Sequence, residues 1–441
     1  MPFPFTRQHR KRTRYALACF IACLLSAPAS GSAKQGFPAN WLMYQSRPNH
    51  NAVFSGGGRA VSWERSFRGK INGGLAVVDG VIYASSFDRH IYALNAKSGT
   101  VIWSYELANI SMSTPLVYDS TVYVGTGTNA VLQDNALGLA WGRPAGDSIF
   151  AIDAKNGTLR WRYPTVGEDM PTPILDVIGT VHQLIFSNGD SHVRSLNADT
   201  GELVWVQPML GVSTMSSLAI RDGIVYGASN FGLGYLNKYS KNSKLIARRS
   251  RTWAMRASDG QYIWMLDHGN SDCSPTVGGD MVYMASDTRE FPLSTIATSY
   301  NTIYGINAAS GAVVWKYRSR TGPWSGTGSN EEAIAGVYNA GTFYDSLPFA
   351  KEVVAFDGLS GRIFWRVKTV GPVKMSPVVD RGKIYFGDTS GWFYVVRLSD
   401  GAVIKKKKFP SFFSTSPPVI VGATIFVANG ASVYAIALRA L

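Results

Sequence analysis

Cysteine is the residue type that this sequence has least of. Three cysteines occur in 441 residues, and Cys19 and Cys23 lie within the first 25 positions. Only Cys273 stands in the rest of the chain, so that part cannot form an internal disulfide and must be stable through packing alone. The sequence also lacks an adjacent cysteine pair and a Cys-x-x-Cys-His motif for an attached haem.

A hydrophobic run long enough to cross a membrane is missing from the N-terminal region. The apolar stretch at residues 15–25 (YALACFIACLL) is too short to span a bilayer. It follows basic residues and precedes small residues that offer cleavage points after Ala29 or Ala33. This order predicts a signal peptide over residues 1–29, and therefore a protein exported to the periplasm or cell surface. Neither Cys19 nor Cys23 follows the Leu-small-small triplet of a lipoprotein.

Acidic residues are scarce, with 29 Asp and Glu against 43 Lys and Arg, and charged residues make up only 16% of the chain. Cleavage after Ala29 would leave 38 basic residues, so the mature protein remains basic. An exported basic protein fits a small anionic substrate, an anionic surface or an acidic medium, and we expect no nucleic-acid partner. The histidines after the leader show no metal-ligand spacing, so we expect no metal site.

Repeats are abundant. A segment ending in Gly-x-x-x-Trp, such as ALNAKSGTVIW, occurs six times. The copies end at Trp103, Trp161, Trp205, Trp264, Trp315 and Trp365. A seventh copy, VRLSDGAVIKK, has Lys405 in place of the tryptophan. Each copy has the pattern of a hairpin with a tight Gly turn, and another strand pair precedes it.

The spacing of the repeats predicts the fold class. Successive repeat glycines lie 58, 44, 59, 51, 50 and 40 residues apart, which is typical of four-stranded propeller blades. The C-terminal unit supplies only three strands, and residues 59–67 (RAVSWERSF) can supply the fourth. Closure by this N-terminal strand would leave no open sheet edge. We therefore predict an all-β, eight-bladed propeller that forms a single domain over residues 40–441.

The repeat resembles the tryptophan-docking motif of the pyrroloquinoline quinone (PQQ)-like propeller superfamily, Ala-x-Asp-x-x-Thr-Gly-x-x-x-Trp. Residues 40–54 (NWLMYQSRPNHNAVF) are similar to the lead-in of its first blade. The resemblance implies one of three kinds of protein: a PQQ-dependent oxidoreductase, a scaffold similar to the assembly factor BamB, or a tetrathionate hydrolase of acid-living sulfur oxidisers. The missing cysteine pair argues against the oxidoreductase, so we expect no cofactor.

Three features favour the hydrolase over the scaffold. No lipoprotein motif is visible, and the low charge suits a surface that must stay folded when carboxylates are protonated. Four connections are far longer than a blade needs, at residues 128–146, 230–251, 289–301 and 318–331, and loops of that length are usually functional or disordered. The leading hypothesis is hydrolysis of tetrathionate or a related polythionate at acid pH. A BamB-like scaffold for envelope assembly, binding partners through its blade edges or loops, remains the alternative.

Alignment of the repeats predicts a ring of side chains along the innermost strands, because alternate residues of a strand share one face. Two residues before the Ser/Pro step, the ring contains Ile71, Met112, Met170, Thr214, Asp272, Ala333, Lys374 and Ser414. Only two members are charged. Asp169 and Glu332 lie one residue away from the ring.

The charged ring residues suggest a division of roles. A carboxyl group in a narrow channel has a raised pKa, so we predict that Asp272 is the catalytic residue that exchanges a proton. Lys374 is predicted to bind the anionic substrate, with Asp169 and Glu332 as further substrate-binding candidates. A structural role for Asp272, capping a turn or pairing with a buried N–H, stays open. Cys273 should point the other way and pack in the protein interior. An outer-membrane surface and a second copy of the chain are further partners to consider.

Overall fold

The computed structural model describes residues 53–54, 60–127, 146–165, 167, 169, 171–209, 211–213, 215–229, 251–267, 271, 273–287, 300–320, 335–348 and 350–441. All of them belong to one compact unit, Ala39–Leu441. The predicted leader and most of the four long connections lie outside the described residues. Within the described part, no helix is long and apolar enough to cross a membrane.

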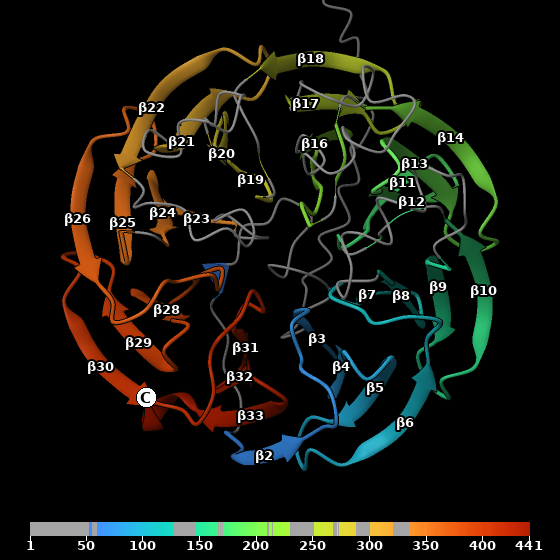
Figure 1. Ribbon diagram of the computed structural model, residues 1–441, viewed down its shortest axis with the longest axis horizontal. Helices are drawn as coiled ribbons and strands as arrows, with labels where there is room; N and C mark the ends of the chain where they lie inside the picture. Colours follow the sequence, from blue (N-terminus) through green and yellow to red (C-terminus); the bar gives the residue numbers. More distant parts are fainter. Residues whose placement is uncertain are drawn as a thin grey trace, which may run out of the picture. The chain divides into compact units, whose positions relative to one another are not determined.

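The unit is an all-β propeller of eight blades, as the repeat spacing predicted (Figure 1). Each blade has four antiparallel strands in order from the centre of the ring to its rim, and the first four blades follow this order. Blade 1 contains β3 (Leu75–Val78), β4 (Val81–Ser85), β5 (His90–Asn95) and β6 (Val101–Glu106); blade 2 contains β7 (Leu116–Tyr118), β8 (Thr121–Gly125), β9 (Ser148–Asp153) and β10 (Leu159–Pro164); blade 3 contains β11 (Ile174–Ile178), β12 (Val181–Ser187), β13 (His192–Asn197) and β14 (Leu203–Pro208); blade 4 contains β15 (Ala219–Arg221), β16 (Ile224–Ala228), β17 (Arg251–Arg256) and β18 (Tyr262–Asp267).

The other four blades repeat this antiparallel order. Blade 5 contains β19 (Thr276–Gly278), β20 (Met281–Asp287), β21 (Tyr300–Asn307) and β22 (Val313–Arg320); blade 6 contains β23 (Val337–Asn339), β24 (Thr342–Leu347), β25 (Glu352–Asp357) and β26 (Ile363–Lys368); blade 7 contains β27 (Val378–Asp380), β28 (Lys383–Gly387), β29 (Trp392–Arg397) and β30 (Val403–Lys408); blade 8 contains β31 (Val419–Val421), β32 (Thr424–Asn429), β33 (Ser432–Ala437) and β2 (Trp63–Ser66). A short 3-10 helix, η2 (Leu438–Ala440), follows β33.

The ring closes as predicted. Strand β2 pairs antiparallel with β33, from Trp63 opposite Ala435 to Ser66 opposite Ser432. One further strand was not predicted: β1 (Val53–Phe54) pairs parallel with β27, so blade 7 has five strands. Both ends of the described chain therefore contribute to the last two blades.

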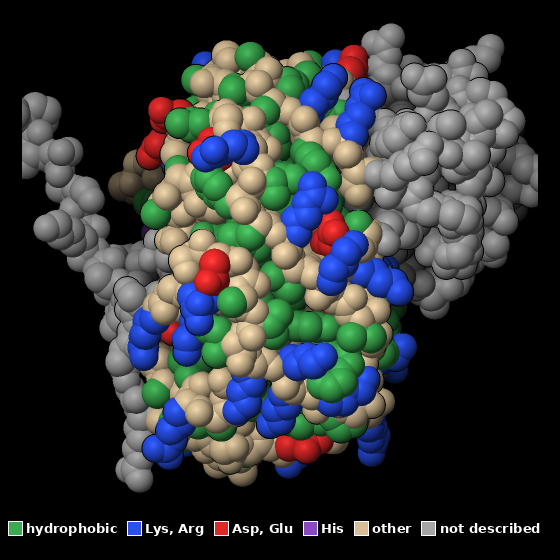
Figure 2. Space-filling model, turned by 90° about the vertical axis from the view of Figure 1, so that its left-hand side faces the viewer, with side chains coloured by type: hydrophobic (Ala, Val, Ile, Leu, Met, Phe, Trp, Pro, Cys, Tyr) green, Lys and Arg blue, Asp and Glu red, His purple; other side chains and the backbone are tan. Residues whose placement is uncertain are grey.

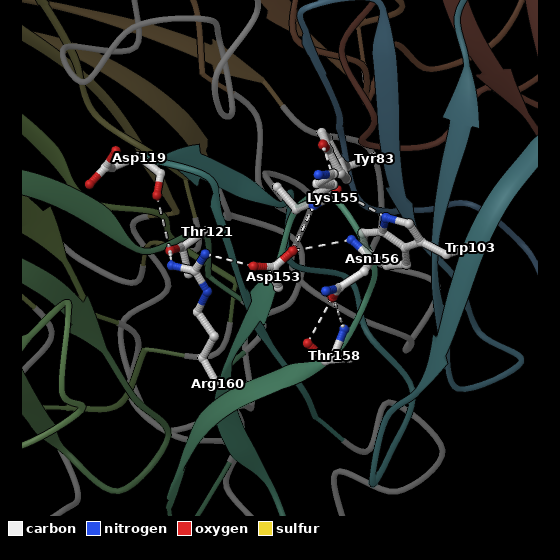
Figure 3. A network of polar contacts seen from close by, with 10 residues as sticks. Tyr83, Trp103, Asp119, Thr121, Asp153, Lys155, Asn156, Thr158 and Arg160 are labelled. Atoms are coloured by element: carbon white, nitrogen blue, oxygen red, sulfur yellow. Dashed lines mark hydrogen bonds and ion pairs between the residues drawn. The ribbon is translucent and has the colours of Figure 1, made fainter.

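Each motif tryptophan fastens its blade to the next one, which confirms their structural role. The indole of Trp103 points toward the turn of blade 2 that holds Asp153, Lys155 and Asn156 (Figure 3). It donates a hydrogen bond to the Ala154 carbonyl (2.9 Å), and its ring covers Gly157. Gly157 has a φ of +74°, and a Cβ there would lie 2.7 Å from the indole, so glycine is required on both counts. Asp153 accepts hydrogen bonds from Arg160 and two backbone N–H groups, which holds the same turn.

The missing seventh tryptophan has a specific substitute. Lys405 lies in β30, and its ammonium group donates a hydrogen bond to the Ala440 carbonyl at the end of blade 8 (2.8 Å). The third and fourth strands of blade 8 come from opposite ends of the chain. No repeat turn exists there for an indole to cover, so the contact between blades is made by a long cationic side chain.

The connections separate into two faces of the ring. Because neighbouring strands are antiparallel, the short turns between first and second strands, and between third and fourth strands, lie at one end, which we call the turn face. The connections between second and third strands, and from one blade to the next, lie at the other end, which we call the loop face. All four long connections join strands that end at the loop face.

Candidate functional site

The loop face carries the predicted site residues that the structure describes. Asp169 precedes β11 of blade 3 and Lys374 precedes β27 of blade 7, across the ring from one another (Figure 1). Asp272 and Glu332 lie outside the described residues. The structure therefore brings the two described candidates to the same face, but not to the same pair of blades.

The segments leading into the innermost strands are linked to one another by hydrogen bonds. The backbone N–H of Gly74 donates to the Thr114 hydroxyl of the next blade (2.8 Å), and the Thr114 N–H donates to the Thr172 hydroxyl (3.1 Å). In the same way, the Thr172 N–H donates to the Ser217 hydroxyl (2.9 Å), and the Ser217 N–H donates to the Ser274 hydroxyl (2.9 Å). The Ser and Thr side chains that precede the innermost strands thus join consecutive blades.

The ring alignment was one residue out in blades 1, 4 and 8. Asp380 of blade 7 pairs with Lys383 across the first turn, and Val78 pairs with Val81 in blade 1. Counting back from these pairs places Asn72, and not Ile71, at the position of Lys374. The same count from Arg221, which pairs with Ile224, and from Val421, which pairs with Thr424, gives Met215 and Thr415 in place of Thr214 and Ser414. Ile71 is 1% exposed and packs in a hydrophobic cluster. The glycine pair that follows it in place of a Ser/Pro step shifted the sequence alignment by one residue.

Cys273 is buried, as predicted. Its side chain packs in a hydrophobic cluster with residues of blades 4 and 5, including Tyr226 and Met284. Its carbonyl accepts a hydrogen bond from the Ser216 hydroxyl (2.7 Å). Ser271 is equally buried, and its hydroxyl donates to the Ala285 carbonyl (2.6 Å). The backbone on both sides of position 272 is therefore held in place by its neighbours.

Asp169 is the most deeply buried of the predicted candidates that are described. It is 1% exposed, at a position that blades 1 and 7 fill with the buried apolar residues Ile71 and Val373. Its carboxylate accepts hydrogen bonds from the Thr165 hydroxyl and from the Asn188 amide (2.5 Å). Its backbone N–H donates to the Thr126 carbonyl of blade 2 (2.9 Å).

Burial raises the pKa of Asp169 well above its ordinary value, although the hydrogen bonds from Thr165 and Asn188 oppose the shift. The negative charges of Asp147 and Asp190 act in the same direction as burial. This carboxyl group therefore retains its proton to a higher pH than an exposed aspartate does. It is positioned to hold a proton inside the wall of the loop face, and its burial makes direct contact with an anion unfavourable unless it is neutral.

Asp147 is a second buried carboxyl group, which the sequence did not indicate. It is 0% exposed, and its Oδ1 accepts a hydrogen bond from the Asn109 amide (3.0 Å). Its Oδ2 takes no hydrogen bond of good geometry from the described residues, and the nearby Thr126 hydroxyl donates to the Ser148 carbonyl. Burial raises the pKa of Asp147 to about 7, against the effect of the Asn109 hydrogen bond. One signal was available: Asp147 immediately precedes the apolar strand β9, whose first five residues are buried.

Asp190 is a third acid near Asp169, and unlike Asp169 and Asp147 it favours the ionised form. Asp190 accepts two hydrogen bonds from the Arg194 guanidinium (2.9 and 2.5 Å), and the His192 ring lies 3.3 Å away. Burial alone would raise the pKa of Asp190, but hydrogen bonds from His192 and Arg194 hold it below its ordinary value. The hydrogen bond with Asp190 raises the pKa of His192. Blades 2 and 3 thus place acids that favour a proton beside one that does not.

Lys374, possible metal ligands and a surface groove complete the description of the loop face and its surroundings. Lys374 is half-buried between the buried residues Val373 and Met375. No group of three His, Cys, Asp or Glu side chains in the described chain comes close enough to hold a metal ion. A surface groove of about 500 Å³ lies between blades 8 and 1, where Arg65, Arg68 and His90 contribute to its lining, and it includes neither Asp169 nor Lys374.

Comparisons with known proteins agree with the resemblance carried by the repeats. The family model described as outer membrane protein assembly factor BamB matches residues 52–317 and 349–440. Tetrathionate hydrolase of Acidithiobacillus ferrooxidans is 26% identical to this chain, over 92% of this chain and 86% of that protein. BamB of Escherichia coli is 24% identical, over 82% of this chain and 83% of that protein.

Solved structures show the same architecture. BamB from Moraxella catarrhalis superposes with a TM-score of 0.60 at 14% identity, covering 85% of this chain and 98% of that one. A europium-containing methanol dehydrogenase superposes with a TM-score of 0.64 at 14% identity, covering 89% and 90%. At such low identity these structures establish the fold, and the chemistry must be argued from the site.

Proposed function

The chain belongs to the family of propellers described as outer membrane protein assembly factor BamB, and we propose that it is an exported enzyme of this fold that hydrolyses tetrathionate or a related polythionate at acid pH. The observation that carries the proposal is the pair of buried carboxyl groups, Asp147 and Asp169, on the loop face. A scaffold has no need for acids that favour a proton in the wall of a site. The similarity to tetrathionate hydrolase over 92% of the chain supports the choice of substrate class.

The proposed reaction is acid–base hydrolysis. Water attacks a polythionate sulfur, the S–S bond breaks, and the leaving sulfur group receives a proton. For tetrathionate, thiosulfate, sulfate, elemental sulfur and two protons balance one tetrathionate dianion and one water. The only external reactant is water, so the chain needs to supply binding, orientation and proton transfer.

Asp272 is the proposed proton-transfer residue. By the alignment of the repeats it belongs to the same ring as Lys374, and its described neighbours Ser271 and Cys273 are buried and hydrogen-bonded. Lys374 is proposed to bind one sulfonate end of the substrate, and Glu332 is a further candidate contact. Asp169 and Asp147, when protonated, leave the wall neutral, so a dianion is not repelled.

Incubation of the purified protein with tetrathionate at about pH 3 and at pH 7 tests the proposal, with thiosulfate and sulfate as the measured products. We expect turnover at the lower pH. Asp272→Asn keeps the shape but cannot exchange a proton, so kcat should fall by roughly 10²-fold or more. Asp280→Asn is the matched control, because Asp280 is an exposed aspartate of the same blade at the turn face. No turnover at either pH would contradict the hydrolase.

The scaffold is the second candidate function, and a specific observation favours it. The outer strands β14 and β18 expose several large apolar side chains, including Val204 (43%), Val206 (45%), Ile263 (42%) and Met265 (44%). An exposed apolar strand edge can pair with a strand of another protein. If the protein lacks turnover, then capture of a defined envelope protein, lost in a Val206→Lys/Met265→Lys variant, would support this alternative.

A further inference from the structure

Three neighbouring outer strands concentrate basic side chains. Strand β22 contributes three, β26 contributes two and β30 contributes four, and none of these strands contains an acidic residue. We call the eight of these whose side chains the structure describes the basic band: Lys316, Arg318, Arg366, Lys368, Lys405, Lys406, Lys407 and Lys408. Blades 5, 6 and 7 are consecutive, so the band extends over one side of the ring (Figure 1).

The basic band is accessible. All six residues of β30 are exposed, and the side chain of Lys368 is 75% exposed. Figure 2 shows this side of the molecule, with many Lys and Arg side chains, few acidic ones, and hydrophobic side chains between them. Glu352 pairs with Lys368 (2.7 Å) and lies near Arg366 (3.5 Å), but it is itself buried, so most of the band's charge faces outward. Lys406 lies over the Trp392 ring, 4.8 Å from its centroid.

The same three strands begin with exposed apolar residues. Val314 is 52% exposed in β22, Phe364 is 44% exposed in β26, and Val403 and Ile404 are 46% and 44% exposed in β30. Every outer strand runs from the turn face to the loop face, because the turn from the third strand lies at the turn face. On each of these strands, the apolar residues therefore lie nearer the turn face, and the residues of the basic band lie nearer the loop face.

Protection of a strand edge does not explain the band. Lysine on an edge strand discourages pairing with other chains, and that need would apply to every outer strand. Yet β14 (LVWVQP) and β18 (YIWMLD) contain no Lys or Arg, although both expose apolar residues in the same way. The difference between blades 3–4 and blades 5–7 therefore points to something that blades 5–7 contact.

We propose that blades 5–7 dock on an anionic lipid bilayer, with the apolar residues in the headgroup–acyl boundary and the basic band against the lipid phosphates. The two layers match the two layers of such a surface, because apolar side chains enter the boundary while Lys and Arg remain at the headgroups. A nucleic acid or a soluble polyanion would use the charges but not the apolar layer. Docking in this orientation leaves the loop face open to solvent, and it does not depend on the proposed hydrolysis.

Co-sedimentation with vesicles tests the proposal on the full mature chain. The vesicles are phosphatidylcholine alone, or phosphatidylcholine with about 30% phosphatidylglycerol, at salt concentrations from about 50 to about 500 mM. Binding to the anionic vesicles should exceed binding to the neutral ones and weaken with salt. A variant with Lys316→Gln, Arg318→Gln, Lys406→Gln and Lys407→Gln should lower the partition constant by at least about tenfold.

Two further variants separate the contribution of the basic side chains from that of the apolar ones. Arg65→Gln, Arg68→Gln, Lys97→Gln and Lys155→Gln remove the same charge from blades 8, 1 and 2, and this variant should stay within about threefold of the unmodified protein. Phe364→Ser with Ile404→Ser should weaken vesicle binding but leave binding to heparin, a soluble polyanion, unchanged. The proposal is overturned if the protein does not bind anionic vesicles at low salt, or if both charge variants lose binding equally. It is also overturned if the apolar variant loses nothing.

Discussion

Two aspartates flank strand β9, with Asp147 immediately before it and Asp153 as its last residue, and they lie in opposite environments. Asp153, at the turn face, accepts hydrogen bonds from Arg160 (2.7 Å) and from two backbone N–H groups, and the Arg160 bond holds its pKa below the ordinary value. Asp147, at the loop face, is fully buried, receives one amide hydrogen bond, and has a pKa raised to about 7. Six residues apart in sequence, they differ because one end belongs to a repeated turn and the other does not.

The comparison extends to the rest of the ring. Asp259, Asp357 and Asp400, in the equivalent turns of other blades, also have lowered pKa values, because hydrogen bonds from Arg256, from Ser360 and from the Ala402 N–H stabilise their charged forms. The turn face repeats one solution, which holds the blades together. The loop face varies from blade to blade, and there the structure retains groups that cost stability when they ionise. Such a division is expected where one face supports the fold and the other supports function.

The largest expected effect is at the turn face. Trp315→Ala removes an indole that is 7% exposed, donates to the Gly358 carbonyl (2.9 Å) and stacks on Phe356 at 5.7 Å between centroids. We expect a loss of about 3–5 kcal/mol in the free energy of unfolding, measured by urea denaturation. Val314→Ala, on the same strand but 52% exposed, is the control and should change it by less than about 0.5 kcal/mol. Equal effects would show that docking of the tryptophan does not hold the blades.

The next largest effect concerns the pH dependence of stability. Burial raises the pKa of Asp147 in the folded protein to about 7, above its ordinary value of 3.8, so the folded protein binds more protons between these pH values. Its contribution is therefore complete below about pH 4 and is lost as the pH rises toward 7, a change of a few kcal/mol. Asp345, fully buried in β24, has a pKa raised by burial to about 7 and acts in the same direction.

Asp147→Asn, which stays neutral at every pH, should reduce this loss between pH 4 and pH 8 in urea denaturation. Asp153→Asn is the matched control at the other end of β9 and should leave the loss unchanged, because its pKa is lowered and it titrates below this window. A stability that rises from pH 4 to pH 7 would contradict the comparison between the two faces.

A smaller effect is expected from truncating the turn aspartate. Asp153→Ala removes the acceptor for Arg160 and for the two turn N–H groups, all of which water can reach. The expected cost is about 1 kcal/mol, because exposed donors can bond to water instead. Thermal unfolding at pH 7 measures it. A loss as large as that of Trp315→Ala would mean that the polar turn, and not the indole, carries the contact between blades.

The last prediction concerns Cys273, which precedes the first strand of blade 5, and tests whether its thiol only packs or also takes part in the reaction. Cys273→Ser should cost about 1 kcal/mol of stability, because the thiol is 2% exposed among apolar residues, and it should leave turnover of polythionate unchanged. Unfolding and product release, measured on the same preparation, test both parts. Loss of turnover with an intact fold would assign the chemistry to the thiol in place of Asp272.

The repeats alone were sufficient to predict the eight blades, the closure by residues 59–67 and the docking role of the tryptophans. These features depend on local patterns, namely alternating strands, glycines with positive φ and an indole at a fixed distance from them, so they can be recognised in sequence. The alignment of the repeats put Lys374 in the ring and Asp169 one residue away from it, and the structure places both just before innermost strands, at the loop face. The alignment was one residue out in blades 1, 4 and 8, and in blade 1 the cause is a glycine pair that replaces the usual Ser/Pro step.

Tertiary structure decided what each polar residue experiences. Nothing local distinguishes Asp147 from Asp153; burial and the number of donors do, and both depend on chain segments that are distant in sequence or belong to another blade. The pairing of β1 with β27, the substitution of Lys405 for an indole and the hydrogen bonds between innermost strands likewise join distant parts of the chain. The sequence determined the ring of blades because its pattern repeats. The properties of the site depend on the tertiary structure, because the proton affinity of a carboxyl group follows from desolvation and from neighbours that only the folded chain brings together.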